Sequence, residues 1–362
     1  MFRKTVVSSI SIIIIIIIII IILGACATPL PAATQNPEPV AEEIIFYDWP
    51  EDMPSSVLDA FTEEYGIKVT YVTYETQNEA IANMRQGEAY DVVVIDNDNI
   101  PRLVREGLLA EIKYDNVPNF KNISANFRDL AYDPGNKHSV PFNWGTTGLL
   151  FRSDLVQINS WADLWRMPAG SKIGFRDEPR DQLGAALKVL GYSINTEDAQ
   201  ELEIALEHLL KIRPHVFIVD SYADPVIPML ASGEIVALVG WAEDALEARE
   251  AHEAITYVLP EEGPMLWGDN FVIPANSPHK YSAEIFLNFL LRPEISAQIV
   301  NENYYANANE AALPFIDPEI RDDSVIYPPN EQLIKGEVYL PLSPDGAKVY
   351  REIWEHFKAA GQ

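Results

Sequence analysis

From residue 44 onward, apolar segments of strand length alternate with amphipathic segments of helix length. The segment 91–95 is a continuous apolar run, which is typical of a strand buried on both faces of a parallel sheet. It is preceded by predicted strands at 44–47 and 67–72, and the predicted helices between and after these strands are 57–65, 77–85 and 100–106. This spacing of strands and helices predicts an open α/β sheet.

A second alternation of the same kind begins near Ser139. Its predicted strands are 148–151, 173–175 and 234–241. The predicted helices in this part of the chain and toward its end are 161–165, 181–190, 200–212, 282–291, 293–301 and 345–359. The chain has 362 residues, and at roughly 100–200 residues per domain this length favours two domains. The sequence therefore predicts two α/β domains.

The residues that follow the apolar runs combine aromatic rings with carboxylates. In open α/β sheets, ligands bind beyond the carboxyl ends of the strands. Indole faces attract cations and pack against methylene groups, while partly desolvated carboxylates bind ammonium groups. These positions therefore predict a ligand with amines joined by aliphatic carbons, and the segments concerned are 48–49, 96–98, 177–178, 241–243 and 267–269.

Charge and motif content exclude several classes of function. The chain has 26 basic and 54 acidic side chains and a net charge of −28, which makes nucleic acid an unfavourable partner. An acidic surface is also an ordinary means of staying soluble. There is no Gly-rich phosphate loop and no nucleophile-elbow motif. The six histidines have no metal-ligand spacing, so neither a cofactor nor a resident metal is predicted.

The N-terminal residues have the pattern of a secretory signal. A basic start with Arg3 and Lys4 precedes an apolar run that contains eleven consecutive isoleucines, and Leu-Gly-Ala-Cys follows at 23–26. This ending resembles a bacterial lipobox, which implies residues 1–25 as signal peptide and Cys26 as the lipidated residue. The Pro- and Ala-rich segment 26–42 is predicted to be a flexible tether. The alternative is an uncleaved transmembrane anchor; both place the rest of the chain outside the cytoplasmic membrane.

From Phe46 onward the sequence resembles the spermidine/putrescine-binding proteins of bacterial ABC transporters. The resemblance rests on segments in the family's order, namely 46–49, 71–75, 90–94, 140–145, 160–165, 267–269, 273–276 and 289–293. It implies a two-lobed α/β fold of the periplasmic-binding-protein type (type II), with a ligand cleft between lobes that two crossover strands join. The implied lobes are 43–145 plus 267–311, and 146–266 plus 312–362.

The resemblance also implies a function and partners. The chain would be a binding protein rather than an enzyme, and it would capture a polyamine for an ABC permease and its ATPase. It would be held at the membrane by its lipid, in the periplasm or on the outer face of the cytoplasmic membrane, and it would act as a monomer. No nucleic acid partner and no cofactor are expected.

Carried over by position, the resemblance assigns roles to individual residues. Asp269 would bind an amine near the centre of the cleft, and Glu178 and Asp181 would bind a second amine. The aromatic walls would be Trp49, Trp241, Trp267 and Tyr305. The chain departs from the family at Asp52, Asp96 and Asp98, where Tyr, Ser and Tyr are frequent, and near Tyr339, where Gln is frequent. The added acids either serve a more highly charged ligand or are solvated loop carboxylates.

Two other functions remain open on the residues alone. The adjacent pair Tyr304 and Tyr305 resembles the metal-binding tyrosines of ferric-ion receptors of the same fold class, and phenolate oxygens suit that metal. Asp177 and Glu178, with Asp181, have the composition of the acid and base pair of a glycoside hydrolase. The first alternative predicts an iron site, and the second predicts a membrane-anchored enzyme.

Overall fold

The computed structural model describes residues 39–219 and 225–361, and a mixed sheet runs through this part of the chain. All elements below belong to the unit that begins at Val40. In chain order the strands are β1 (Glu43–Asp48), β2 (Lys68–Thr73), β3 (Val92–Asp96), β4 (Ser139–Arg152), β5 (Ile173–Arg176), β6 (Val216–Val219), β7 (Ala237–Trp241), β8 (Ile255–Val258), β9 (Met265–Val272), β10 (Ala306–Asn307) and β11 (Glu337–Val338).

The sheet contains the same parallel arrangement twice. In the first half-sheet, β1 lies between β2 and β3 and is parallel to both. In the second half-sheet, β5 lies between β6 and β7, again parallel to both. In each half the middle strand comes first in the chain, and the next two strands of that half are added on its opposite sides. The carboxyl ends of β1 and β3, and those of β5 and β7, are therefore the places where ligands bind in such sheets.

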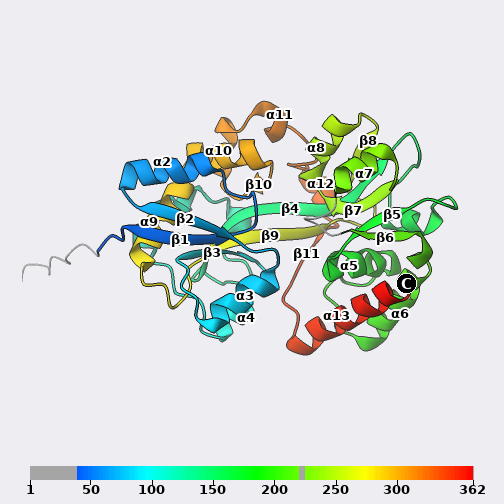
Figure 1. Cartoon of the computed structure of the whole chain (residues 1–362), viewed down its shortest axis with the longest axis horizontal. Coiled ribbons are helices and arrows are strands. Elements are labelled where there is room, and N and C mark those ends of the chain that lie inside the picture. Colours follow the sequence, from blue (N-terminus) through cyan, green and yellow to red (C-terminus); the bar gives the residue numbers. More distant parts are fainter. Residues whose placement is uncertain (1–38, 220–224, 362) are drawn as a thin grey trace, which may run out of the picture. The chain divides into compact units, whose positions relative to one another are not determined.

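Two long strands connect the half-sheets. β4 has 14 residues, a length of roughly 46 Å at 3.3 Å per residue, and it pairs antiparallel with β7 and with β9. β9 in turn pairs antiparallel with β3. In Figure 1 both strands run from the side of β1–β3 to the side of β5–β7.

Helices cover both half-sheets. Around the first half-sheet lie α2 (Ser55–Tyr65), α3 (Gln77–Gln86), α4 (Ile100–Arg105), α9 (Lys280–Leu290) and α10 (Pro293–Asn303) (Figure 1). Around the second lie α5 (Pro179–Leu190), α6 (Ala199–Leu210), α7 (Val226–Ser232), α8 (Asp244–Ala251) and α13 (Pro344–Ala359). The remaining helices are α11 (Pro318–Arg321), α12 (Asn330–Leu333), η1 (Tyr114–Asn116), η2 (Pro118–Asn122), η3 (Ala125–Phe127), η4 (Trp161–Arg166), η5 (Arg213–His215) and η6 (Glu310–Phe315).

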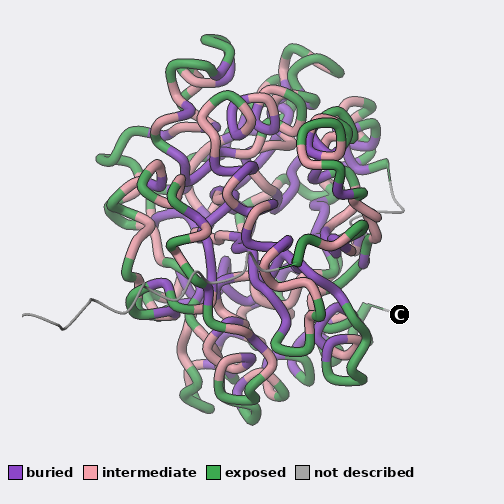
Figure 2. The backbone as a smooth tube through the Cα atoms, turned by 90° about the vertical axis from the view of Figure 1, so that its left-hand side faces the viewer, coloured by how far each residue is buried: buried purple, intermediate pink, exposed green. Residues whose placement is uncertain are grey.

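The hydrophobic cores follow the same division. Phe46, Val94 and Phe271 belong to a cluster on the first half-sheet, whereas Leu149 and Phe175 belong to a cluster on the second. Figure 2 shows the buried segments of the backbone toward the middle of the molecule and the exposed ones toward its outside. Each half thus buries its own apolar side chains, which is the requirement for two units that can move relative to each other.

The sequence locates most elements to within a few residues. One expectation is wrong: Trp267 and Asp269 were placed just after a strand, but both lie inside β9. This strand has Gly268 and Asp269 among its residues and has no unbroken apolar run, so its pattern does not indicate a strand. The predicted lobe boundaries stay a prediction. The segment after 311 includes Ile316 and Ile320, which belong to the same buried cluster as Val300 of α10.

The predicted signal peptide, the predicted lipidation site at Cys26 and most of the predicted tether lie outside the described residues. Within the ranges 39–219 and 225–361, the helices fall short of the length and apolar character that a membrane crossing requires.

Candidate ligand-binding site

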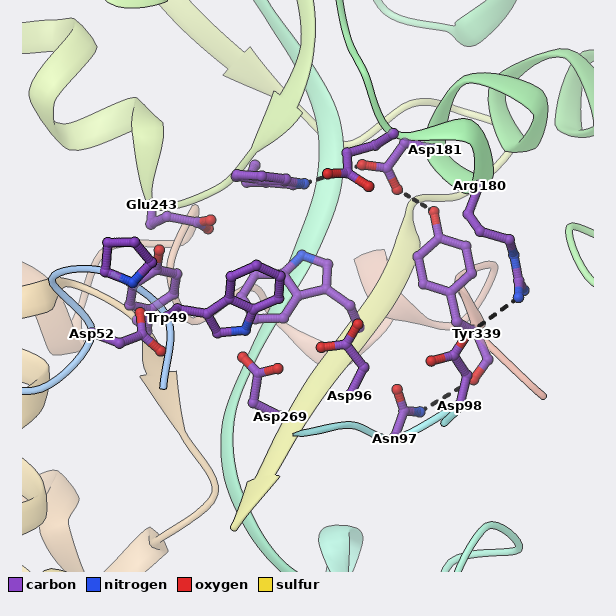
Figure 3. Close-up of a pocket in the computed structure, with 15 residues that line it drawn as sticks. Trp49, Asp52, Asp96, Asn97, Asp98, Arg180, Asp181, Glu243, Asp269 and Tyr339 are labelled. Carbon is purple, nitrogen blue, oxygen red and sulfur yellow. Dashed lines mark hydrogen bonds and ion pairs between the residues drawn. The ribbon is translucent and has the colours of Figure 1, made fainter. Parts of the chain in front are cut away.

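A cavity of about 210 Å³ lies where the carboxyl ends of β1, β3, β5 and β7 meet the middle of β9. All of the predicted ligand residues line it, from both half-sheets and the crossing strand: Trp49, Asp52, Asp96, Asp98, Glu178, Asp181, Trp241, Trp267, Asp269, Tyr305 and Tyr339. The structure therefore brings the whole predicted set together (Figure 3).

The aromatic walls are held in place by their neighbours. The guanidinium of Arg176 lies 4.2 Å from the ring centroid of Trp241, and the indole N–H of Trp241 donates to Asp181 over 3.1 Å. Trp49 contacts Tyr74 with ring centroids 4.6 Å apart. The walls are therefore preorganised, which reduces the conformational entropy that these side chains lose when a ligand binds.

Trp267 depends on a glycine of the opposite strand. Gly145 of β4 is paired with Trp267 in the sheet register. A Cβ atom on Gly145 would lie 2.2 Å from Cζ2 of that indole. Glycine is found in strands where another group approaches the backbone this closely, so Gly145 creates the space in which the ring lies.

We expect Gly145→Ala to lower the free energy of unfolding by about 1–3 kcal/mol, because the ring must leave its position to avoid overpacking. Gly268→Ala is the matched control, since the nearest atom to its added Cβ is 3.6 Å away. Urea denaturation of both variants measures the difference. Equal stabilities would contradict this account of Gly145.

Two of the cavity carboxylates are already engaged by the protein. Asp181, in the first turn of α5, accepts hydrogen bonds from the indole of Trp241 and the hydroxyl of Tyr339. Asp98 forms an ion pair with Arg180 at 3.3 Å (Figure 3). Asp181 therefore orients the aromatic walls, and Asp98 is neutralised by Arg180. The added acid at position 98 thus does not increase the negative charge available to a ligand.

Asp96 and Asp269 form a pair on the cavity floor. They face each other in the antiparallel register of β3 and β9. Their side chains are hydrogen-bonded to each other, and the indole N–H of Trp49 also donates to Asp269. Burial and the Asp52 charge raise the pKa of Asp269 to about 7, and burial and Asp269 raise the pKa of Asp96. The pair therefore retains a proton near neutral pH in the absence of a cation.

Three further acids complete the cavity. Burial raises the pKa of Asp52 to about 7 and, with the Asp181 and Asp96 charges, the pKa of Glu178 to about 8. Burial and the neighbouring Asp244 raise the pKa of Glu243. Carboxylates that repel one another in this way stabilise a cation placed among them.

Of the residues behind the two alternative functions, Tyr305, Glu178 and Asp181 line the cavity, but Tyr304 and Asp177 do not. Tyr305 lines the cavity, but Tyr304 is 41% exposed and is not among the lining residues. No group of three or more acidic, His or Cys side chains in the described ranges has the arrangement of a metal site. Asp177 binds Trp354 and Lys358 of α13 instead of facing Glu178 across the cavity.

Four lining residues had no role assigned from the sequence, namely Pro50, Asn97, Arg180 and Glu243, although Asn97 and Glu243 lie in the segments 96–98 and 241–243 that were expected to face a ligand. Each lies within two residues of a predicted ligand residue, so position after a strand was the available signal. Asn97 donates to the carbonyl of Tyr339 over 3.2 Å, a long-range contact that the sequence pattern does not contain.

Three comparisons relate this chain to known proteins. The family model for bacterial extracellular solute-binding proteins matches residues 56–326. The spermidine/putrescine-binding periplasmic protein of Salmonella typhimurium is 34% identical over 325 residues, which are 88% of this chain and 92% of that protein.

Solved structures give the same result. The spermidine/putrescine ABC transporter substrate-binding protein PotD of Streptococcus pneumoniae is 30% identical, with a TM-score of 0.79 over 89% of this chain and 100% of that one. The TpPotD lipoprotein of Treponema pallidum is 26% identical, with a TM-score of 0.77 over 87% of this chain and 99% of that one. These matches confirm the predicted two-lobed α/β fold with its two crossing strands.

Proposed function

Because the chain belongs to the family of bacterial extracellular solute-binding proteins, we propose that it captures a polyamine outside the cytoplasmic membrane and delivers it to an ABC importer. The observation that carries this proposal is the cavity itself. Its walls are indole and phenol rings, and between them lie carboxylates such as Asp96 and Asp269, for which the described residues offer no ion pair; this matches a chain of methylenes that carries ammonium groups.

Each part of the cavity has a role in this proposal. Trp49, Trp241, Trp267 and Tyr305 pack against the methylenes, and Asp269 with Asp96 binds an ammonium in the middle of the slot. Glu178 binds a second ammonium, while Asp181 holds Trp241 and Tyr339 in place behind it. No catalytic step is assigned to any of these side chains.

Binding is coupled to closure of the two lobes. Asp269 and Trp49 come from the side of the first half-sheet, whereas Glu178 and Trp241 come from the second. A ligand can contact both sets only when the lobes are together, so it shifts the population toward the closed form. The permease and its ATPase then receive the ligand from that form. The lobe boundaries 43–145 plus 267–311 and 146–266 plus 312–362 belong to this proposal.

The membrane attachment is also a proposal. The lipobox at 23–26 and the Pro-rich segment after it support a lipid on Cys26 and a tether that leaves the binding domain free to reorient. The solved relative from Treponema pallidum is named a lipoprotein. Mass spectrometry of the mature N-terminus tests the lipid, and the monomer expected here is tested by sedimentation of the detergent-solubilised chain.

Calorimetric titration of the full-length protein in detergent tests the function. Putrescine, spermidine and spermine are compared with Fe(III) and with a neutral disaccharide. We expect saturable one-to-one binding of at least one polyamine and none of the iron or the sugar. Binding of Fe(III) or of the sugar in the absence of any polyamine affinity would overturn the proposal.

A further inference from the structure

Arg180 and Asp98 come from opposite half-sheets and contact each other directly. Asp98 lies in the turn after β3, and Arg180 lies in the first turn of α5, which packs on the second half-sheet. Nη1 of Arg180 lies 3.3 Å from Oδ2 of Asp98, and Figure 3 shows this ion pair at one end of the cavity. The pair joins the two sides of the cavity through protein atoms alone, so it needs no ligand atom between its members.

The guanidinium of Arg180 is held in place by neighbours on the side of the second half-sheet. It donates to Oδ1 of Asn195 over 2.8 Å and to the carbonyl of Leu340 over 3.2 Å. It also lies 4.8 Å from the ring centroid of Tyr339 and 5.5 Å from that of Tyr350 in α13. A guanidinium that is fixed in this way loses little further entropy when it pairs. Arg180 therefore presents a preorganised cation to the first half-sheet.

The carboxylate of Asp98 also faces a cation on its own side of the cavity. Its charge interacts with Arg102 of α4 as well as with Arg180, and Arg102 is in turn paired with Glu106 at 3.3 Å. The side chains of Arg180 and Asp98 are 20% and 21% exposed, and partly exposed ion pairs stabilise a structure only moderately. The pair is therefore strong enough to bias the position of the two lobes and weak enough to break.

Closing the cleft also brings like charges together. Glu178 of the second half-sheet is repelled by Asp96 of the first, and Glu243, which follows β7, repels Asp269 of β9. Such repulsion disfavours the closed form, whereas a pair of opposite charges across the same cleft favours it. The contact of Arg180 with Asp98 therefore offsets part of the repulsion among the cavity acids.

We propose that Arg180 is a positioning residue that acts through Asp98, and that their ion pair is a latch that stabilises the closed form of the cleft. The inference rests on the proposed polyamine function and adds to it the two residues that set the balance between the open and closed forms. A ligand that binds only the closed form has an apparent affinity proportional to the population of that form. The latch therefore tightens the binding of every polyamine by the same factor.

A latch and a simple charge effect predict opposite results for Arg180→Gln. Removing a cation from the cavity lining makes the cavity more negative, so a charge effect alone would tighten the binding of a polyamine. Loss of the latch instead weakens the binding of putrescine and spermidine alike, by about three- to fivefold. Calorimetric titration of the full-length protein in detergent measures both affinities. Unchanged or tighter binding by this variant would overturn the latch.

Asp98→Asn breaks the same ion pair from the other lobe. We expect it to weaken both polyamines by a similar factor, about three- to fivefold. The double variant Asp98→Asn, Arg180→Gln should bind no more weakly than either single variant, because all three lack one and the same interaction. Additive losses in the double variant, or a loss in Asp98→Asn alone, would mean that the two side chains act separately, and the latch would be rejected.

Arg102→Gln is the matched control for charge. It removes a cation that faces the same carboxylate from α4 but does not reach across the cleft. We expect affinities within about 1.5-fold of wild type, since this charge contributes equally to the open and closed forms. A loss as large as that in Arg180→Gln would contradict a role for contact between the lobes.

Hydrogen exchange of the ligand-free protein tests the latch without any polyamine. Peptides 47–53 and 241–244 should exchange faster in both single variants, because an open cleft exposes the cavity. Asp52 and Glu243, which these peptides contain, lie at the end of the cavity away from Arg180 (Figure 3), so a disturbance confined to Arg180 would not reach them. Peptides from the buried strands β3 and β5 should exchange as in wild type, which would show that the variants are folded.

The outcomes distinguish the two proposals. Identical exchange in wild type and in both single variants would overturn the latch and leave the proposed function intact. Wild-type protein that bound no polyamine would overturn the proposed function, and the exchange of peptides 47–53 and 241–244 would still decide whether Arg180 and Asp98 hold the cleft closed.

Discussion

Replacing Asp269 with asparagine is expected to weaken spermidine binding by about 100-fold or more. Asp269 is 8% exposed, receives the indole N–H of Trp49 and is hydrogen-bonded to Asp96 on the adjacent strand. An ammonium held there loses one partner of a desolvated charge pair, a change that costs about 2–5 kcal/mol in protein complexes. Isothermal titration of the full-length protein measures the loss.

The asparagine substitution separates charge from shape. It keeps the size of the side chain and a hydrogen-bonding group, so the fold should remain intact, as thermal unfolding would verify. Asp59→Asn, on the exposed face of α2, removes the same charge from the surface and should leave affinity within about twofold. If Asp269→Asn bound spermidine as tightly as wild type, the central amine site would have been assigned to the wrong residue.

Lowering the pH from 8.5 to 5.5 is expected to reduce spermidine affinity by about 100-fold or more. Burial raises the pKa of Asp52 and of Asp269 to about 7 and the pKa of Glu178 to about 8. Below these values the carboxyls are protonated and cannot pair with an ammonium. Each carboxyl that must lose its proton on binding lowers the affinity by up to roughly tenfold for every pH unit below its own pKa.

Calorimetry in buffers of different ionisation enthalpy should detect the protons released at pH 6.5. In the Asp52→Asn variant fewer protons should be released, because one of the raised carboxyls is absent. An affinity that stays constant across this pH range, with no proton release, would contradict the burial of these acids in an uncompensated state.

The same pKa shifts determine how the stability of the ligand-free protein depends on pH. A carboxyl whose pKa is raised on folding binds more protons in the folded than in the unfolded state, between its ordinary value near 4 and its raised value. The free energy of unfolding should therefore fall as the pH rises through 7 and 8. Urea denaturation at pH 5.5 and 8.5 tests this sign, and bound spermidine should offset the loss at the higher pH.

How far the site could be predicted differs between residues. Trp49, Asp96 and Trp241 lie at the ends of strands whose apolar runs are evident in the sequence. Adjacent residues are harder to distinguish. Glu178 faces the cavity while Asp177 binds α13, and Tyr305 lines the cavity while Tyr304 is exposed. Backbone turns after the strand or helix decide these orientations, and residue type alone does not encode them.

Pairing among the acids is also invisible in the sequence. Asp98 and Asp52 are both departures from the family pattern and look equivalent as letters. In the fold, Asp98 forms an ion pair with Arg180, whereas Oδ2 of Asp52 has no hydrogen-bond partner among the residues that the structure describes. Asp98 and Asp52 therefore differ in the negative charge that they offer to a ligand.

The sequence by itself determined the repeated alternation of strands and helices and hence the ends of β1, β3, β5 and β7 at which a ligand would bind. These features depend on the periodicity of apolar side chains along neighbouring residues, which local sequence contains. Only the tertiary structure decided that Trp267 and Asp269 lie within a crossing strand, and that Asp52 and Glu243 line the same cavity. Those outcomes depend on contacts between segments far apart in the chain, whose free energy arises from burial and charge in three dimensions.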